Sequence, residues 1–284
     1  MRLSRLSFGV FPRRGRRFWA VVTLVCCLVL GAESLWAGKS VALPWTDLLR
    51  RGVEIYQWSS LTDAQEVRLG QAIHRQLIGQ EFAVYPDTVL TDYVTQVGER
   101  LLAGTSRTLP YTFTVVRSPQ VNAFATMGGF VYVTTGLLGQ VRNEAELAGV
   151  IGHEIGHITG RHVVKQMQQM AVAQGIATAA GLDSNRLTGL GLELALRRPR
   201  SREAEMDADR RALRYVLAAG YDPSGLLNFM RGLAGRPAPP SFLSTHPAPQ
   251  ERLAALAERV PPQAEPGFGL DEIAYRSAVQ NRLP

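Results

Sequence analysis

Apolar residues recur at helical spacing beyond residue 60, and capping residues mark where two helices begin. Thr62 and Gln65 form a capping-box pattern at the start of a helix that we expect to end near Ile78. Asp87 is placed to cap a second helix that ends near Leu102. The pattern therefore predicts two helices ahead of the central part of the chain.

A small sheet is predicted next. Residues 111–117 and 130–134 alternate apolar and polar side chains, 122–126 is a third candidate strand, and Met127-Gly128-Gly129 suits a turn. Further on, 163–197 indicates two helices with a mobile joint that can cover a site. The predicted fold class is α+β and mostly helical, with the small β-sheet directly before the helix described next.

That helix starts at Asn143, an N-cap, with Glu146 in the capping-box position. Its largely apolar sequence indicates burial. Four glycines recur along it at helical spacing: Gly149, Gly152, Gly156 and Gly160. Each glycine costs about 1 kcal/mol relative to alanine in a helix. We therefore expect another element to pack very close to this stripe.

The same helix carries the pattern H-E-x-x-H, with His153 and His157 four residues apart and Glu154 between them. Side chains at this spacing lie on one helix face, so both imidazoles can bind one metal ion. Glu154 can then act as a general base on water. The plain alternative is a solvated helix face that carries two histidines.

A zinc site needs a third protein ligand, and His162 is five residues after His157. Because five residues turn a helix by roughly 140° from the starting face, His162 is expected to face elsewhere. The segment 201–219 predicts a helix whose buried stripe includes Glu205 and Asp209. Glu205 is the candidate third ligand, and Asp209 is a candidate partner of a ligand histidine. The alternative for these acids is an internal salt bridge to an arginine.

On the opposite, solvated face of that helix we expect Glu203, Asp207, Arg210 and Arg214.

The first 37 residues are typical of an export signal. They hold six arginines and one acid, and the apolar run 18–30 is short for a membrane span. We expect a signal peptide at 1–37, with an uncleaved N-terminal anchor as the rival. Residues 38–260 are the predicted metallopeptidase domain, and 261–284 is a C-terminal tail too short for a repeat domain. Trp45 and Trp58 flank a segment that packs on the domain or lies at a membrane surface.

Charge and cysteine content narrow the function further. Without the first 37 residues the chain has 25 basic and 23 acidic residues, so no nucleic-acid partner is expected. Both cysteines, Cys26 and Cys27, lie in the apolar run. The remaining chain has no disulfide framework, and a metal site there must use His, Asp and Glu.

A set of motifs appears in a fixed order along residues 62–260. They are Asn122-Ala-Phe, Gly128-Gly129, Gly136-Leu137-Leu138, His153-Glu154-Ile-Gly-His157 with Arg161-His162, Ser201-Arg202 with Glu205 and Asp209, and Ser244-Thr245-His246-Pro247-x-Pro249-x-Glu251-Arg252-Leu253. This set resembles the HtpX/BepA branch of the metallopeptidases related to CAAX prenyl proteases. The resemblance implies a gluzincin fold and one zinc per chain held by His153, His157 and Glu205. It also implies Glu154 as base, endopeptidase activity and a role in bacterial envelope protein quality control.

Two further assignments concern substrate and turnover. An edge strand beside such a helix binds the substrate backbone in many zinc peptidases. The candidate substrate-binding residues are Asn122, Phe124, Gly128, Gly129 and Val131. Plain structural strands are the alternative. His246, in a loop bounded by Pro247, is a candidate catalytic residue that stabilises the oxyanion, or a fourth zinc ligand that holds the enzyme off, or an ordinary loop histidine.

We therefore expect a secreted zinc metalloendopeptidase in the periplasm of a Gram-negative bacterium. Its expected partners are unfolded or misassembled envelope proteins, with peripheral membrane association and oligomeric state left open. Two alternatives remain: a chaperone-like binding module with a structural zinc, and a membrane-surface scaffold that uses the 45–58 segment.

Overall fold

The computed structural model describes residues 61–173, 184–234, 241–261 and 266–284. All of them belong to one compact unit that spans residues 49–284. The predicted export signal, the segment with Trp45 and Trp58, and residues 174–183, which include most of the predicted joint, lie outside the described residues. No helix among the described residues is long and apolar enough to span a membrane.

The first two helices follow the prediction. Helix α3 (Asp63–Gln76) begins at the Thr62–Gln65 capping box and continues into the π-helical turn η1 (Leu77–Glu81). Helix α4 (Thr88–Leu102) begins at Asp87, whose side chain accepts a hydrogen bond from the Leu90 N–H.

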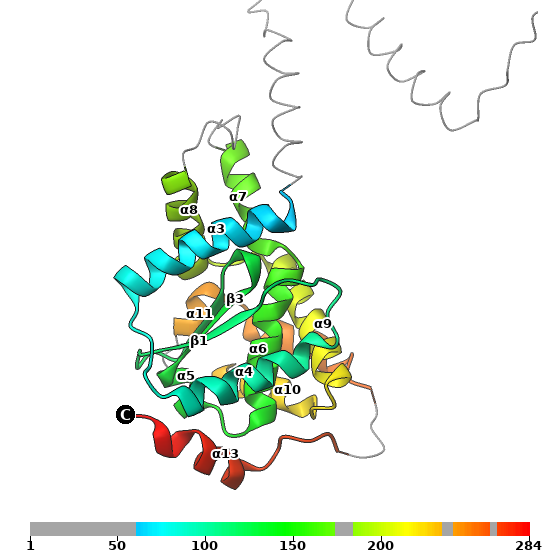
Figure 1. Cartoon of the computed structure of the whole chain (residues 1–284). Helices are drawn as coiled ribbons and strands as arrows, with labels where there is room; N and C mark the ends of the chain where they lie inside the picture. Colours follow the sequence, from blue (N-terminus) through cyan, green and yellow to red (C-terminus); the bar gives the residue numbers. More distant parts are fainter. Residues whose placement is uncertain (1–60, 174–183, 235–240, 262–265) are drawn as a thin grey trace, which may run out of the picture. The chain divides into compact units, whose positions relative to one another are not determined.

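The three predicted strands form one sheet in the order β1-β3-β2. Strand β1 (Thr112–Val116) pairs in parallel with β3 (Phe130–Thr134), and β2 (Ala123–Ala125) pairs with β3 in antiparallel. The turn η2 (Met127–Gly129) joins β2 to β3. One face of the sheet packs in a core with α4 and α6 (Glu144–Thr159), and the other packs in a second core with α3, α7 (His162–Ala173) and α8 (Ser184–Leu196) (Figure 1). The strand order makes β3 the central strand and β2 an edge strand.

Helix α6 (Glu144–Thr159) carries H-E-x-x-H and is buried over almost its whole length. The Asn143 side chain accepts from the Glu146 N–H at 2.9 Å, as predicted for the N-cap. The other half of the predicted capping box is different, because the Glu146 carboxylate accepts from the Arg142 N–H at 2.9 Å.

The remaining helices among the described residues are α5 (Thr135–Gln140), α7 (His162–Ala173), α8 (Ser184–Leu196), α9 (Arg202–Ala218), α10 (Ser224–Ala234), α11 (Ser241–Thr245), α12 (Pro249–Ala257), α13 (Glu272–Ala278) and the short η4 (Gln280–Arg282).

The glycine stripe of α6 packs against α9 and α10, which confirms the expected close approach. A Cβ built on Gly156 would lie 2.7 Å from the carbonyl oxygen of Ala208 on α9. A Cβ on Gly149 would lie 2.8 Å from the Cα of Leu226 on α10. The backbones of α6 and α9 can approach this closely only because a glycine stands at the crossing.

The residues beyond 265 return to the same core. The Tyr275 hydroxyl on α13 donates to the Leu138 carbonyl at 3.0 Å, and the Ala145 N–H donates to the Gly269 carbonyl at 2.9 Å. Tyr275 and Val279 are buried. Sequence reasoning assigned no element to this stretch, whereas the structure shows a helix that packs beside the start of α6.

Candidate metal centre and active site

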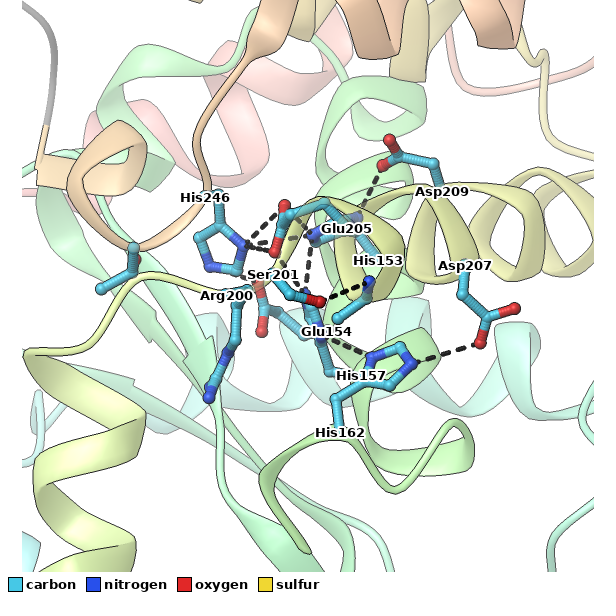
Figure 2. A network of polar contacts seen from close by, with 12 residues as sticks. His153, Glu154, His157, His162, Arg200, Ser201, Glu205, Asp207, Asp209 and His246 are labelled. Carbon is cyan, nitrogen blue, oxygen red and sulfur yellow. Dashed lines mark hydrogen bonds and ion pairs between the residues drawn. The ribbon is translucent and has the colours of Figure 1, made fainter. Parts of the chain in front are cut away.

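Four side chains from three parts of the chain converge beside α6 (Figure 2). Helix α6 supplies His153 and His157, α9 supplies Glu205, and His246 follows directly after α11. One ligand atom from each lies within 4.8 Å of the others, and all four residues are at most 1% exposed. The structure therefore brings together all three predicted ligands and His246.

The spacing of these atoms fits a single ion. The His153 Nε2 atom lies 3.0 Å from His157 Nε2, 3.2 Å from His246 Nδ1 and 3.4 Å from Glu205 Oε2. The Glu205 Oε1 atom lies 3.2 Å from His157 Nε2 and 3.1 Å from His246 Nδ1. A tetrahedral zinc ion with bonds of about 2.0–2.1 Å separates its donors by about 3.3 Å. Two or three imidazoles and one carboxylate are also donors that zinc accepts. The buried group is thus consistent with one zinc ion.

Asp209 lies where the helical phase of α9 predicted it. Its Oδ1 atom is 2.8 Å from His153 Nδ1, the ring nitrogen that faces away from the other donors. Burial and Arg252 disfavour charge on His153, but the carboxylates of Glu205 and Asp209 outweigh them and raise the pKa of His153 to about 9. Burial alone would raise the pKa of Glu205, but the three surrounding histidines hold it well below its usual value.

Arg252 on α12 is a site residue that belongs to the last motif of the sequence but to which the sequence alone gave no role. Its Nε and Nη2 atoms donate to the two oxygens of Asp209, each at 2.7 Å, and its Nη1 atom lies 2.6 Å from Glu205 Oε2. The side chain is buried. A salt bridge had been an alternative to the metal role of the two acids, and the structure contains it alongside the histidine contacts. The available signal was chemical, since two buried acids require cations around them.

His162 and Asp207 correct two predictions. His162 is not one of the four clustered donors, but it does not face away from the site, because its Nδ1 atom lies 2.8 Å from His157 Nδ1. Asp207 was expected on the solvated face, yet it is only partly exposed and its Oδ2 atom lies 3.2 Å from His162 Nε2. Burial lowers the pKa of His162 to about 4 despite the nearby Asp207 carboxylate.

Glu154 is fully buried, and neither of its carboxylate oxygens has a hydrogen-bond partner among the residues that the structure describes. The His246 Nε2 atom lies 3.5 Å from Glu154 Oε1 and also lacks a hydrogen bond. Leaving buried polar atoms unpaired is costly, so such groups usually mark a functional site. The arrangement can bind an ion, a water molecule and the polar atoms of a substrate next to a carboxylate base.

The predicted substrate-binding residues do not all lie where a substrate can reach them. Val131 is on the central strand β3 and pairs with both neighbouring strands, so strand addition at Val131 is wrong. Phe124 is buried against Tyr132, with ring centroids 4.7 Å apart.

The two turn glycines are covered as well. Positions for a Cβ on Gly128 and Gly129 meet the backbone of Glu66 and of Pro110, at 2.6 Å and 2.7 Å. Asn122, just before the edge strand β2, remains a candidate because its buried Oδ1 atom has no hydrogen-bond partner in the described part of the chain.

Comparison with known proteins identifies the family. Residues 89–260 match the model of peptidase family M48, which is more than half of the chain and includes all four clustered donors. The chain belongs to peptidase family M48. The resemblance inferred from the motifs is thereby confirmed.

Several relatives of this chain are named as proteases. The chain is similar to the β-barrel assembly-enhancing protease of Yersinia pestis, with 32% identity over 84% of this chain and 53% of the relative. It is similar to the mitochondrial metalloendopeptidase OMA1 of Arabidopsis thaliana, with 31% identity over 78% of this chain and 50% of the relative. It is also similar to the metalloprotease LoiP of Escherichia coli, with 29% identity over 75% of this chain and 87% of the relative. The chain spans about half the length of the first curated relatives it matches.

The ligand assignment predicts that the wild-type chain holds about one zinc ion. It also predicts that Glu205→Ala loses most of this zinc. Glu203→Ala is the matched control, because Glu203 is on the same turn of α9 but exposed. Metal analysis of the two purified variants and the wild type checks this. Equal zinc loss in both variants would contradict the assignment.

Proposed function

We propose that the protein is a zinc-dependent endopeptidase that cleaves unfolded or misassembled proteins of the bacterial envelope. The observation that carries the proposal is the buried group of His153, His157, Glu205 and His246 beside an unpaired Glu154. Membership of peptidase family M48 and the names of the relatives support the reaction class. The name of the Yersinia pestis relative, which refers to β-barrel assembly, supports envelope proteins as the substrate class.

In this proposal His153, His157 and Glu205 hold the zinc ion. When bound, zinc polarises the scissile carbonyl and lowers the pKa of a water molecule. Glu154 accepts a proton from the attacking water through its unpaired carboxylate and later donates it to the leaving amine. The Asp209 carboxylate fixes the ring of His153 through the 2.8 Å contact to Nδ1, and Arg252 in turn fixes Asp209.

One observation favours a second candidate function. Four protein donors, with His246 as the fourth, are the number that structural zinc sites use, whereas catalytic sites keep one position open. A chaperone-like binding module with a structural zinc would have such a closed site. The two candidates differ in what they require of Glu154, since a structural zinc needs no base.

We therefore expect Glu154→Gln to abolish cleavage of casein or another unfolded substrate while zinc content stays near one per chain. The amide keeps the shape of the side chain but cannot accept the proton. Substrate digestion by the full chain, with and without a chelator, measures the effect. Digestion by Glu154→Gln at the wild-type rate would favour the binding-module function instead.

His246 provides a test of the resting state. Its Nδ1 atom lies with the other donors, so we expect that His246→Ala opens the site and raises the basal rate of unfolded-substrate cleavage at matched zinc content. If His246 instead stabilises the oxyanion through its unpaired Nε2 atom, its loss lowers turnover by about 10²–10³-fold. An unchanged rate would exclude both roles.

We propose that the catalytic domain is exported to the periplasm, with residues 1–37 as the export signal or an N-terminal anchor. The arginine-rich start and the apolar run support this proposal. Alkaline phosphatase fused after residue 60 should be active, because alkaline phosphatase reaches its active fold only outside the cytoplasm. An inactive phosphatase fusion together with an active cytoplasmic reporter at the same position would refute export.

A further inference from the structure

The two histidines of H-E-x-x-H have different outer partners. Both rings direct Nε2 toward the clustered donors, so each leaves its Nδ1 atom to contact the surrounding protein. For His153 that contact is the Asp209 carboxylate at 2.8 Å. For His157 it is another histidine, because His157 Nδ1 lies 2.8 Å from His162 Nδ1. Figure 2 shows the second contact continuing from His162 to Asp207.

The chemistry of the imidazole rings fixes which atom donates in each hydrogen bond from His157 through His162 to Asp207. A histidine that binds a metal through Nε2 carries its proton on Nδ1, so His157 is the donor. His162 Nδ1 must then accept, which places the His162 proton on Nε2. That proton points to Asp207 Oδ2, 3.2 Å away. Asp207 accepts at the same time from Arg211 Nε at 2.6 Å and from Arg210 at 2.8 Å, so its carboxylate is held in place.

The backbone around His162 is built to return its ring to α6. Arg161 has a φ of 55°, which is unfavourable for a residue with a side chain, and this turn ends α6 and starts α7. The Arg161 side chain is held by Glu66, whose Oε1 atom accepts from Nε at 2.8 Å. At Gly160 an added Cβ would lie 2.4 Å from His162 Nε2, so the glycine provides the space for the ring.

We propose that His162 is a positioning residue, which orients the ring of His157 and keeps its proton on Nδ1 so that Nε2 is available to the metal. His162 is not one of the clustered donors, so it acts on the metal site only through His157. The proposal rests on the proposed metal site, and it adds a residue to which no role had been assigned. Loss of such an outer partner typically weakens metal binding by about 10–100-fold.

The test is the zinc affinity of the full chain, measured by competition with a chromophoric chelator, for the wild type and three variants. His162→Leu removes the hydrogen-bond acceptor and puts an apolar side chain of similar size in its place, so zinc affinity should fall by about 10–100-fold. His162→Asn places an amide oxygen near the position of Nδ1, so it should retain an affinity close to that of the wild type. His162→Gln places its amide near the position of Nε2, so it should lose about as much affinity as His162→Leu.

His74→Leu is the matched control. Its ring also makes a 2.8 Å contact through Nδ1, to the Tyr132 hydroxyl, but it is not part of the clustered donors. We expect wild-type zinc affinity in this variant. Circular dichroism of the metal-free proteins verifies that every compared variant is folded.

Three results would overturn the proposal: wild-type affinity in His162→Leu, an Asn variant as weak as the Leu variant, or an equal loss in the His74 control. Failure of the proposed function gives a different result, because the wild-type chain would then bind no zinc or would bind it without cleaving any substrate. A higher zinc affinity in His162→Asn than in His162→Gln is the outcome that a purely structural role of His162 does not predict.

Discussion

The close crossing of α6 and α9 is the constraint on which the site depends. Gly156 allows the Ala208 carbonyl to lie where a side chain would otherwise be, and Gly152 faces Ala212 at ordinary contact distance. This crossing brings Glu205 to within 3.2 Å of His157 Nε2 and 3.4 Å of His153 Nε2. A separation larger by one methyl group would take the carboxylate out of bonding range of an ion held by the two histidines. The helix therefore contains glycines despite their cost of about 1 kcal/mol each, because the donor geometry needs them.

Charge balance follows from the same packing. Three carboxylates, from Glu154, Glu205 and Asp209, are buried at the site, and the buried cations around them are Arg252 and Arg200. Arg200 is anchored on the opposite side from Asp209, by Gln166 and the Leu194 carbonyl, each at 3.1 Å. When a divalent ion is bound and its histidine ligands are neutral, the ion, the two arginines and the three carboxylates sum to one net positive charge. A positive surplus suits a reaction that develops negative charge on a carbonyl oxygen.

Local rules predicted the parts of the site that lie on single helices. The cap at Asn143 located α6, and the apolar stripe of α9 separated Glu205 and Asp209 from Glu203. The failures occurred where the chain changes direction. His162 would face away only on a continuous helix, but the left-handed turn at Arg161 resets the helical phase. Alternation also identifies the faces of a strand without giving the strand order, so Val131 could be named as a substrate-binding residue although it lies on the central strand.

The four donors come from elements of different length. This difference matters for the proposed function, because a polypeptide substrate must reach the fully buried Glu154. His153, His157 and Glu205 come from two long helices in direct backbone contact, whereas His246 follows a helix of five residues. The His246 ring stacks on Phe242 with centroids 4.3 Å apart, and Phe242 is tied to the Val121 carbonyl by one hydrogen bond of 3.1 Å. Displacing His246 would free one coordination position while leaving the other three donors in place. Val121 directly precedes Asn122 and β2, so α11 is hydrogen-bonded next to the edge strand to which, in the proposed function, an extended substrate would pair.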